Sequence, residues 1–243
     1  MTELSGKIIV VTGAGSGIGH ASYKALAAEG ATIALCDINE AAVKTGCSEL
    51  GGEHQFYALD VGSSQQCNEI VARIVGHFGR IDGLFNCAGV NPTESPLAET
   101  TDEYWDKLVS TNLRGPYNMT RACIPHLQTG GVIVNVSSTA GIRASAGFAI
   151  YNATKFGVIG FSKSMALELG PKGIRVNVIA PGPIDTPTNA SVMEGEDAVR
   201  RIEQRISMGR LGKPDEVADV VTFLFSEKSR WVNGAVIEVT GGM

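Results

Sequence analysis

Tyr151 and Lys155 have the side-chain types and the spacing for proton transfer. On a helix, side chains four positions apart lie on the same face about one turn from each other, so a phenol and an ammonium group would be neighbours. A free phenol has a pKa near 10, so catalysis near neutral pH requires that pKa to fall by about three units. The site must then stabilise the phenolate over the phenol by roughly 4 kcal/mol. The charge of Lys155 would supply part of it, and Tyr151 is therefore a candidate general acid/base.

A glycine-rich turn near the N-terminus indicates a nucleotide site. The sequence TGAGSGIG at residues 12–19 directly follows a short apolar run. Glycines permit positive φ and a close approach of the backbone to a pyrophosphate at a helix N-terminus. The spacing is Gly-x-x-x-Gly-x-Gly, so taken alone it could also be only a tight turn. The expected cofactor contacts in this turn are Gly13, Ser16, Gly17, Ile18 and Gly19.

Asp37 bears on the choice between the two nicotinamide dinucleotides. It ends the second apolar run, eighteen residues after Gly19, where a carboxylate can accept hydrogen bonds from ribose hydroxyls and would repel a 2′-phosphate. Neither Ser16 nor Ile38 is a lysine or arginine, so no cation stands there to neutralise that phosphate. We therefore expect NAD rather than NADP, with Asp37 and Ile38 beside the adenosine. The alternative is an ordinary solvated aspartate at a strand end.

Further polar and small residues follow the third and fourth apolar runs. In parallel sheets ligands bind at the carboxyl ends of the strands, so we expect cofactor contacts there. The candidates are Asp60, Val61, Asn86, Ala88 and Gly89. Asp60 could instead cap a helix, and Asn86 could instead bond neighbouring strands. Cys87 is expected to be small filler, because nothing nearby in the sequence marks a histidine partner.

The elements that must position these residues alternate along the sequence. Short apolar runs, expected as strands, lie at 7–12, 32–37, 55–59, 83–86, 132–137, 175–180 and 235–239. Longer amphipathic stretches, expected as helices, lie at 17–29, 39–50, 63–78, 102–127, 151–169 and 214–225. This pattern predicts one α/β domain over residues 1–243, a Rossmann fold with a doubly wound parallel sheet of about seven strands and helices on both faces. Residues 187–208 carry no strand signal and could form short helices or a flap over the substrate.

Composition excludes several classes of function. The net charge is -5 and the charges of both signs are mixed, so we expect no nucleic-acid partner. Five cysteines without a Cys-x-x-Cys pair, and four scattered histidines, predict neither disulfides nor a metal site. The polar N-terminus resembles neither a signal peptide nor a transmembrane span, so we expect a cytoplasmic protein that does not contact a membrane.

Taken together, these motifs resemble the short-chain dehydrogenase/reductase family over nearly the whole sequence. They are residues 12–19, the NCAG segment at 86–89, Asn112, Ser137-Ser138, Tyr151-x-x-x-Lys155 and Pro181-Gly182. The resemblance implies a catalytic tetrad of Asn112, Ser138, Tyr151 and Lys155, and the thirteen-residue spacing to Tyr151 selects Ser138 over Ser137.

The family resemblance also implies roles for these residues. Tyr151 would transfer the proton, Ser138 would bind the substrate oxygen, and Lys155, with the nicotinamide cation, would lower the tyrosine pKa and hold the nicotinamide ribose. Asn112 would support a water relay, although it could instead satisfy backbone groups in a helix kink. Further cofactor contacts implied by the family are Pro181, Gly182, Ile184 and Thr186. A homotetramer is expected through helices 102–127 and 151–169, with a dimer as the alternative.

The substrate depends on residues outside the tetrad, at 91–94, 142–148 and 187–208. With Ile142, Phe148 and Met193 in the implied pocket, a moderately apolar secondary alcohol or its ketone is expected. Arg143 could pair with a substrate carboxylate or make a surface contact. An NAD-dependent alcohol dehydrogenase is thus the leading hypothesis. The alternatives are an NADPH-dependent carbonyl or 3-oxoacyl-thioester reductase and, from another class, a non-catalytic nucleotide-binding regulator.

Overall fold

A parallel sheet forms the centre of the structure, a computed structural model that describes residues 3–189 and 195–243. Its strands are β1 (Ile8–Thr12), β2 (Thr32–Asp37), β3 (Gln55–Ala58), β4 (Ile81–Asn86), β5 (Leu127–Val136), β6 (Arg175–Pro181) and β7 (Val236–Val239). They lie in the order β3-β2-β1-β4-β5-β6-β7, and all neighbours are parallel. The predicted doubly wound sheet is confirmed. The strand order reverses between β1 and β4, where such sheets bind ligands outside the carboxyl ends of the strands.

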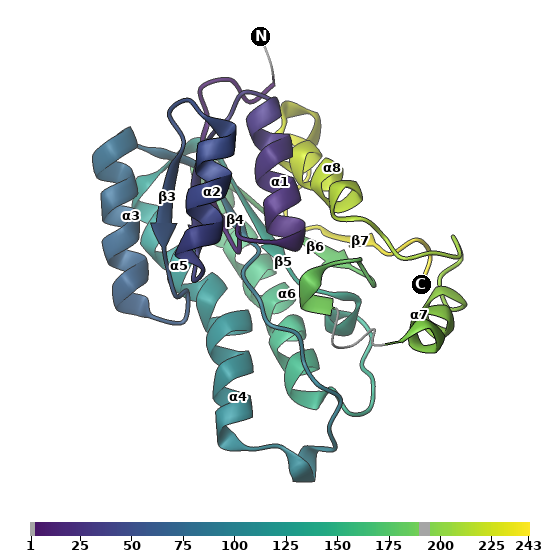
Figure 1. Ribbon diagram of the computed structural model, residues 1–243. Helices are drawn as coiled ribbons and strands as arrows, with labels where there is room; N and C mark the ends of the chain where they lie inside the picture. The colour runs from purple at the N-terminus through teal and green to yellow at the C-terminus, as the bar shows by residue number, and fades with distance from the viewer. Residues whose placement is uncertain (1–2, 190–194) are drawn as a thin grey trace.

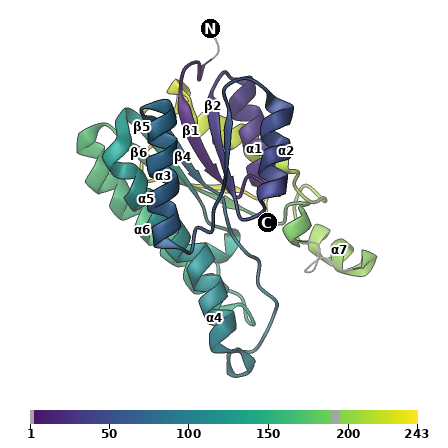
Figure 2. The same cartoon turned by 60° about the vertical axis from the view of Figure 1, so that its left-hand side comes forward.

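Helices cover both faces of the sheet (Figures 1 and 2). One face carries α1 (Gly17–Ala28), α2 (Glu40–Leu50) and α8 (Pro214–Phe225), and the other carries α3 (Ser64–Phe78), α5 (Gly115–Cys123) and α6 (Ala149–Leu169). Alternate side chains of β1 enter the two apolar layers: Val11 packs in the layer that includes Leu26 of α1, and Val10 packs in the layer that includes Ile74 of α3. Because both faces are buried, the strand appears in the sequence as a continuous apolar run.

The helix predicted over residues 102–127 is interrupted. The structure has α4 (Asp102–Val109), a π-helical turn η2 (Ser110–Arg114), α5, and a short 3₁₀ turn η3 (Ile124–His126), after which β5 already begins. The N–H of Gly115 bonds back to the carbonyl of Ser110, a five-residue spacing that widens the helix by one residue. Such π turns mark functional positions in many helices. Asn112 lies within this one.

Residues 187–208 form short helices where the structure describes them. A 3₁₀ turn η6 (Pro187–Asn189) precedes α7 (Glu196–Glu203), which lies apart from the two helical layers and close to the C-terminus (Figure 1). After α7, the Ser207 hydroxyl donates to the carbonyl of Gly242 (2.8 Å), and the N–H of Met208 donates to the carbonyl of Gly241 (3.0 Å). The C-terminal segment therefore anchors the far end of this region.

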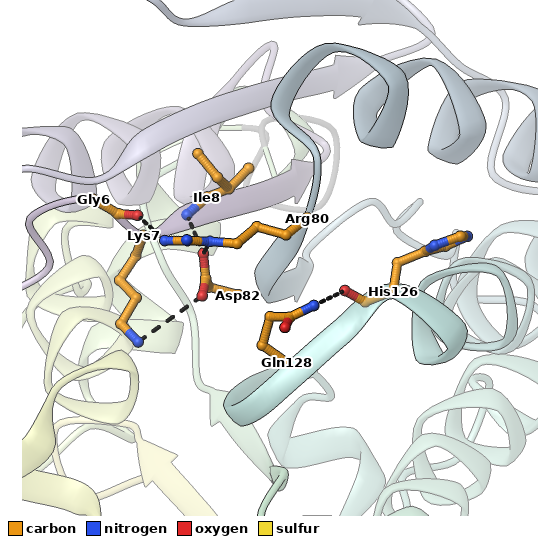
Figure 3. Close-up of polar contacts among 7 residues, drawn as sticks. All are labelled: Gly6, Lys7, Ile8, Arg80, Asp82, His126 and Gln128. Atoms are coloured by element: carbon orange, nitrogen blue, oxygen red, sulfur yellow. Dashed lines mark hydrogen bonds and ion pairs between the residues drawn. The ribbon is translucent and has the colours of Figure 1, made fainter.

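A buried carboxylate joins β1 to β4 at the amino edge of the sheet (Figure 3). Asp82, 8% exposed, accepts hydrogen bonds from the N–H of Ile8 and from Nε of Arg80, both at 2.9 Å. Lys7 Nζ lies 4.0 Å from the same carboxylate, and Arg80 also donates to the carbonyl of Gly6 (2.7 Å). These contacts connect the two strands at which the order reverses, at the end opposite the predicted site.

Candidate active site

A cavity of about 680 Å³ opens along the carboxyl edge of the sheet. The predicted residues that line it are Gly13, Ser16, Gly17, Ile18, Gly19, Asp37, Ile38, Asp60, Val61, Ala88, Gly89, Ser138, Tyr151, Lys155, Pro181, Gly182, Ile184 and Thr186. Residues that are far apart in the sequence therefore meet around one space. Two predicted residues, Asn86 and Asn112, are not among its lining.

The glycine turn fits a dinucleotide pyrophosphate. Gly13 has φ of 68°, and a Cβ on it would lie 2.8 Å from the Cα of Ala88. A Cβ on Gly19 would lie 2.0 Å from the carbonyl oxygen of Gly13, so no other residue fits there. Ser16 is the N-cap of α1 but its hydroxyl makes no capping bond, which leaves the first-turn N–H groups available to an anion. This geometry fits a phosphate at the start of α1, and the cofactor contacts of the turn stay a prediction.

Asp37 is held in place by the backbone. Its Oδ2 accepts a hydrogen bond from the N–H of Gly15 (2.9 Å) and its Oδ1 accepts one from the N–H of Asn39 (2.8 Å). A Cβ on Gly15 would lie 2.9 Å from the Asp37 carboxyl carbon, so the close approach requires glycine. Ile38 beside it is 77% exposed at the cavity rim. The carboxylate is a fixed wall of the cavity rather than a freely solvated group.

Tyr151 and Lys155 project from the first turns of α6 into the same cavity. Lys155 Nζ lies 5.6 Å from the centroid of the Tyr151 ring and donates to the carbonyl of Val136 (3.2 Å). The lysine is only 5% exposed, although it carries a charge. The four-residue spacing on one helical face thus brings phenol and ammonium together, as the sequence predicts.

The pKa of each group shifts in the direction that burial dictates. Burial raises the pKa of Tyr151 to about 12, and a hydrogen bond with Ser138 only partly opposes this. Burial lowers the pKa of Lys155 to about 8. Without the cofactor the tyrosine pKa therefore does not fall, because loss of water disfavours the charged form of both groups. The predicted fall includes the nicotinamide cation and stays a prediction. At neutral pH the phenol is protonated and can act as a general acid toward a carbonyl oxygen.

The two neighbouring serines have different surroundings. Ser137 is 2% exposed, and its hydroxyl donates to the backbone carbonyl of Lys155 (2.8 Å). Ser138 lines the cavity, and its hydroxyl accepts a hydrogen bond from the N–H of Ala140 (3.2 Å) while it also contacts Tyr151. Both serines line the cavity, but the Ser137 hydroxyl is already bonded to the backbone of Lys155, whereas the Ser138 hydroxyl lies beside Tyr151. Ser138 therefore stays the predicted tetrad serine.

Comparisons with known proteins match this arrangement over almost the full sequence. The family model adh_short_C2, described as enoyl-(acyl carrier protein) reductase, matches residues 13–243. The 3-oxoacyl-[acyl-carrier-protein] reductase of Thermotoga maritima is 41% identical over 99% of both proteins. The chain belongs to the short-chain dehydrogenase/reductase family. The human (3R)-3-hydroxyacyl-CoA dehydrogenase is 38% identical, and the match covers 99% of this protein and 97% of the relative.

A solved structure of the same family agrees with the fold. The 3-ketoacyl-(acyl-carrier-protein) reductase of Brucella melitensis, crystallised with NADH, superposes with a TM-score of 0.90 at 33% identity over 98% of both proteins. The protein is therefore an oxidoreductase of the short-chain dehydrogenase/reductase family, and the family's cofactor is a nicotinamide dinucleotide.

Asn112, expected to be a tetrad member in this family, uses its side chain to hold the loop after β4. Its Oδ1 accepts a hydrogen bond from the N–H of Val90 (2.8 Å), and its Nδ2 donates to the carbonyl of the same residue (2.9 Å). A Cβ on Gly89 would lie 3.3 Å from that Oδ1 and 3.7 Å from Lys155 Nζ, so all three residues are close together. The Asn112 side chain is thus occupied by the backbone of Val90. A role of Asn112 in the predicted water relay would therefore fall to its own backbone.

Asn86 faces away from the cavity of this family member. Its Nδ2 donates to Asn135 Oδ1 (2.8 Å) and to Thr120 Oγ1 (3.2 Å), and Asn135 in turn donates to Ser162 (2.8 Å). This buried polar network connects β4, β5, α5 and α6. The predicted cofactor contact is therefore replaced by the alternative, a bond between neighbouring strands.

Two further alternatives are decided by local contacts. The Asp60 carboxylate accepts a hydrogen bond from the N–H of Gly62 (2.8 Å), whereas the residue that caps α3 is Ser63, which accepts one from the N–H of Gln66 (3.3 Å). Helix capping by Asp60 is therefore wrong, and its side chain lines the cavity. Burial raises the pKa of the Cys87 thiol to about 12, so it stays protonated and serves as filler.

Thr12 is a positioning residue that belongs to the 12–19 motif but received no role from the sequence. Its hydroxyl oxygen accepts hydrogen bonds from the N–H groups of Cys87 (3.1 Å) and Ala88 (3.2 Å). It therefore fixes the loop after β4 against the glycine turn. The signal in the sequence was a threonine at the end of an apolar strand, directly before a glycine turn.

The substrate end of the cavity comes largely from the predicted segments 91–94, 142–148 and 187–208, although some individual residues differ from the prediction. Phe148 lines it, together with Asn91, Pro92, Glu94, Ser145, Asn189, Ile202, Arg205 and Met243. Arg143 does not face it, because its guanidinium bonds to Glu238 (2.9 Å) and to the carbonyl of Met243 (3.1 Å). The surface-contact alternative for Arg143 is therefore the correct one. Met193 lies outside the described residues, and Ile142 is not among the lining.

Proposed function

We propose that this protein transfers hydride between NAD(H) and carbon 3 of a 3-oxoacyl or 3-hydroxyacyl thioester. The observation that carries the proposal is a single cavity that joins the glycine turn and Asp37 to the Ser138–Tyr151 pair. It occurs in a protein whose relatives include a 3-oxoacyl-[acyl-carrier-protein] reductase and a (3R)-3-hydroxyacyl-CoA dehydrogenase. We therefore prefer a thioester substrate to the simple secondary alcohol that the sequence favoured.

The protein's own residues would handle the proton and the orientation of the substrate. When bound, the nicotinamide cofactor supplies or accepts the hydride. In the reductive direction the protonated phenol of Tyr151 donates to the oxygen on carbon 3, and the Ser138 hydroxyl holds that oxygen in place. Lys155 would hold the nicotinamide ribose, with Ile184 and Thr186 beside the carboxamide. Proton transfer of this kind contributes about 10²- to 10⁴-fold to the rate.

We propose NAD(H) as the cofactor because of the fixed carboxylate of Asp37. Both of its oxygens accept backbone hydrogen bonds, so the charge cannot turn away from the cavity without losing them. A 2′-phosphate beside it would meet an anion held at that position, whereas ribose hydroxyls can donate to the remaining lone pairs.

The test is oxidation of NADH and of NADPH by the wild type, with acetoacetyl-CoA and with a panel of simple ketones. Tyr151→Phe is compared with Tyr117→Phe, an exposed tyrosine on α5 that does not line the cavity. We expect NADH-linked reduction of acetoacetyl-CoA that falls at least about 100-fold in Tyr151→Phe and is unchanged in Tyr117→Phe.

Other outcomes would support the alternatives. Turnover of simple ketones without turnover of the thioester would restore the alcohol dehydrogenase hypothesis, and turnover with NADPH alone would overturn the argument from Asp37. Tight nucleotide binding without turnover on any substrate would favour the non-catalytic regulator.

We also propose that the protein is a cytoplasmic homotetramer, with a dimer as the alternative. Trp105 on α4 and Phe156 on α6 are 48% and 44% exposed, and these helices lie next to each other at the predicted subunit interface. Large apolar side chains gathered on one surface commonly mark protein contacts. Size-exclusion chromatography with light scattering measures the assembly, and Trp105→Glu should reduce its size. Among the described residues, no helix has the length and apolar character to cross a bilayer.

A further inference from the structure

The substrate end of the cavity carries a cation for which the catalytic scheme has no use. Among the described residues that line the cavity, the cationic side chains are Lys155 and Arg205. Lys155 lies beside Tyr151, so its charge belongs to the reacting centre. Arg205 is exposed and lies just beyond α7, where its backbone N–H bonds to the carbonyl of Ile202 (3.0 Å).

The guanidinium of Arg205 has no acceptor among residues 3–189 and 195–243, unlike that of many other arginines in this protein. Those whose guanidinium groups do bond to protein acceptors are Arg80, Arg121, Arg143, Arg175, Arg210 and Arg230. A guanidinium offers five N–H donors in a planar fork that matches a carboxylate or a phosphate. Arg205 therefore presents an unused anion-binding group to the cavity.

The position of Arg205 is fixed by long-range contacts of the residues that directly follow it. Ser207 and Met208 bond to the backbone of Gly242 and Gly241, so the segment after α7 lies against the segment after β7. Figure 1 shows α7 beside the C-terminus, away from the sheet. Arg143 ties the same C-terminal segment to the loop after β5. The guanidinium thus belongs to a wall that is anchored at two places.

The chemistry of the neighbouring lining indicates what reaches Arg205. Phe148, Ile202 and Met243 are apolar and line the same cavity, so they suit the uncharged part of a substrate. Glu94, the acidic residue at this end of the cavity, comes from the loop after β4, where Ser95 bonds to Gly147. An anion would avoid the loop that carries Glu94 and be attracted to Arg205.

We propose that Arg205 binds an anionic group of the substrate, a phosphate or a carboxylate, at the end away from the reacting carbonyl. This inference rests on the proposed hydride transfer at carbon 3, and it adds that the 3-oxo substrate carries an anionic group. The anion has two possible sources: the phosphates of a coenzyme A thioester, or the free carboxylate of a short 3-oxo acid. Arg205 is a specificity-determining residue that contacts substrate without taking part in proton transfer.

The test uses Arg205→Gln with Arg201→Gln as the matched control, because Arg201 is exposed on α7 and does not line the cavity. Two substrate pairs differ by an anion: acetoacetyl-CoA against acetoacetyl-N-acetylcysteamine, and acetoacetate against methyl acetoacetate. We expect Arg205→Gln to lower kcat/KM about 10- to 100-fold for the anionic member of one pair, mainly through KM. The neutral members, and all substrates with Arg201→Gln, should be unaffected. The pair that responds identifies the source of the anion.

Three results would overturn the inference. One is an equal loss for anionic and neutral members. Another is a larger dissociation constant of NADH for Arg205→Gln by fluorescence titration, which would show that Arg205 binds an anion of the cofactor. The third is no loss at all. If the wild type turned over no thioester, the proposed function would fail, and the acetoacetate pair would still test Arg205. If neither substrate pair is turned over, acetoacetyl-CoA and acetoacetate are titrated calorimetrically into the NADH complexes of the wild type and of Arg205→Gln. Weaker binding of either anion to Arg205→Gln supports the inference. Equal binding to both proteins, or no detectable binding to the wild type, overturns it.

Discussion

Replacing Lys155 with methionine should make the cofactor-free protein more stable at neutral pH while it abolishes turnover. The lysine is 5% exposed, and burial lowers its pKa from 10.5 to about 8. The folded state therefore disfavours the ammonium relative to the unfolded state. This cost is fully present below the folded pKa and disappears as the pH rises toward the unfolded value. Methionine has a similar length and carries no charge.

The magnitude follows from the two pKa values. At about 1.4 kcal/mol for each tenfold change, the buried charge costs about 3 kcal/mol at pH 7 and about 2 kcal/mol at pH 9. Methionine leaves the carbonyl of Val136 without the hydrogen bond it receives from Lys155 Nζ at 3.2 Å, which removes about 1 kcal/mol of the gain. The net expectation is a variant about 2 kcal/mol more stable at pH 7, with an advantage that shrinks by about 1 kcal/mol at pH 9.

The assay is urea unfolding of both proteins at pH 7 and pH 9, at one protein concentration and without cofactor. Lys163→Met is the control, because Lys163 is exposed on the same helix and should give no pH-dependent difference. The reasoning would be refuted if Lys155→Met were less stable than the wild type at pH 7, or if the difference were the same at both pH values. The same lysine predicts that reductive kcat/KM declines as the pH rises through about 8, because the ammonium charge is then lost.

Three further changes test the turn, the cofactor preference and the far edge of the sheet. Gly19→Ala should weaken NADH binding at least about 10-fold by fluorescence titration, since its Cβ would lie 2.0 Å from the carbonyl oxygen of Gly13, and unchanged affinity would contradict the assigned site. Asp37→Asn should lower the NADH-to-NADPH ratio of kcat/KM at least about 10-fold, because unit charges 4 Å apart repel by about 1 to 4 kcal/mol depending on the surroundings; a constant ratio would show that this carboxylate does not discriminate. Asp82→Asn should reduce the free energy of urea unfolding by about 1 to 3 kcal/mol, because it weakens the bonds to Arg80 and to β1, while a change in NADH affinity would contradict its placement at the opposite edge.

Local pattern in the sequence was enough to predict the sheet and the reacting pair. Most strands are apolar runs flanked by turn residues, as the interior of a parallel sheet requires, whereas β5 begins at Leu127 with an exposed polar stretch, five residues before its predicted start. Tyr151 and Lys155 meet because a helix places residues four apart on one face, which needs no tertiary information. The glycine turn was equally local: Gly13 and Gly19 are close in the sequence, and their contact depends on the backbone of one strand-to-helix connection.

The tertiary structure decided what depends on contacts between distant segments. Whether the Asn86 side chain meets a cofactor or Asn135 depends on the pairing and register of β4 with β5, which the sequence of one strand does not encode. The contacts of Arg143 come from Glu238 and the C-terminal segment, almost a hundred residues away, and they leave Arg205 as the cation at the substrate end.

The direction of the Tyr151 and Lys155 pKa shifts has the same origin. Spacing predicts that the two groups are neighbours, but only the folded protein sets how much water surrounds them, and the loss of water is the largest cause of both pKa shifts. The sequence by itself thus determined which groups stand together on one element and in what order the elements follow. The tertiary structure decided which partners and how much solvent each group has, because both depend on segments that approach only in the folded protein.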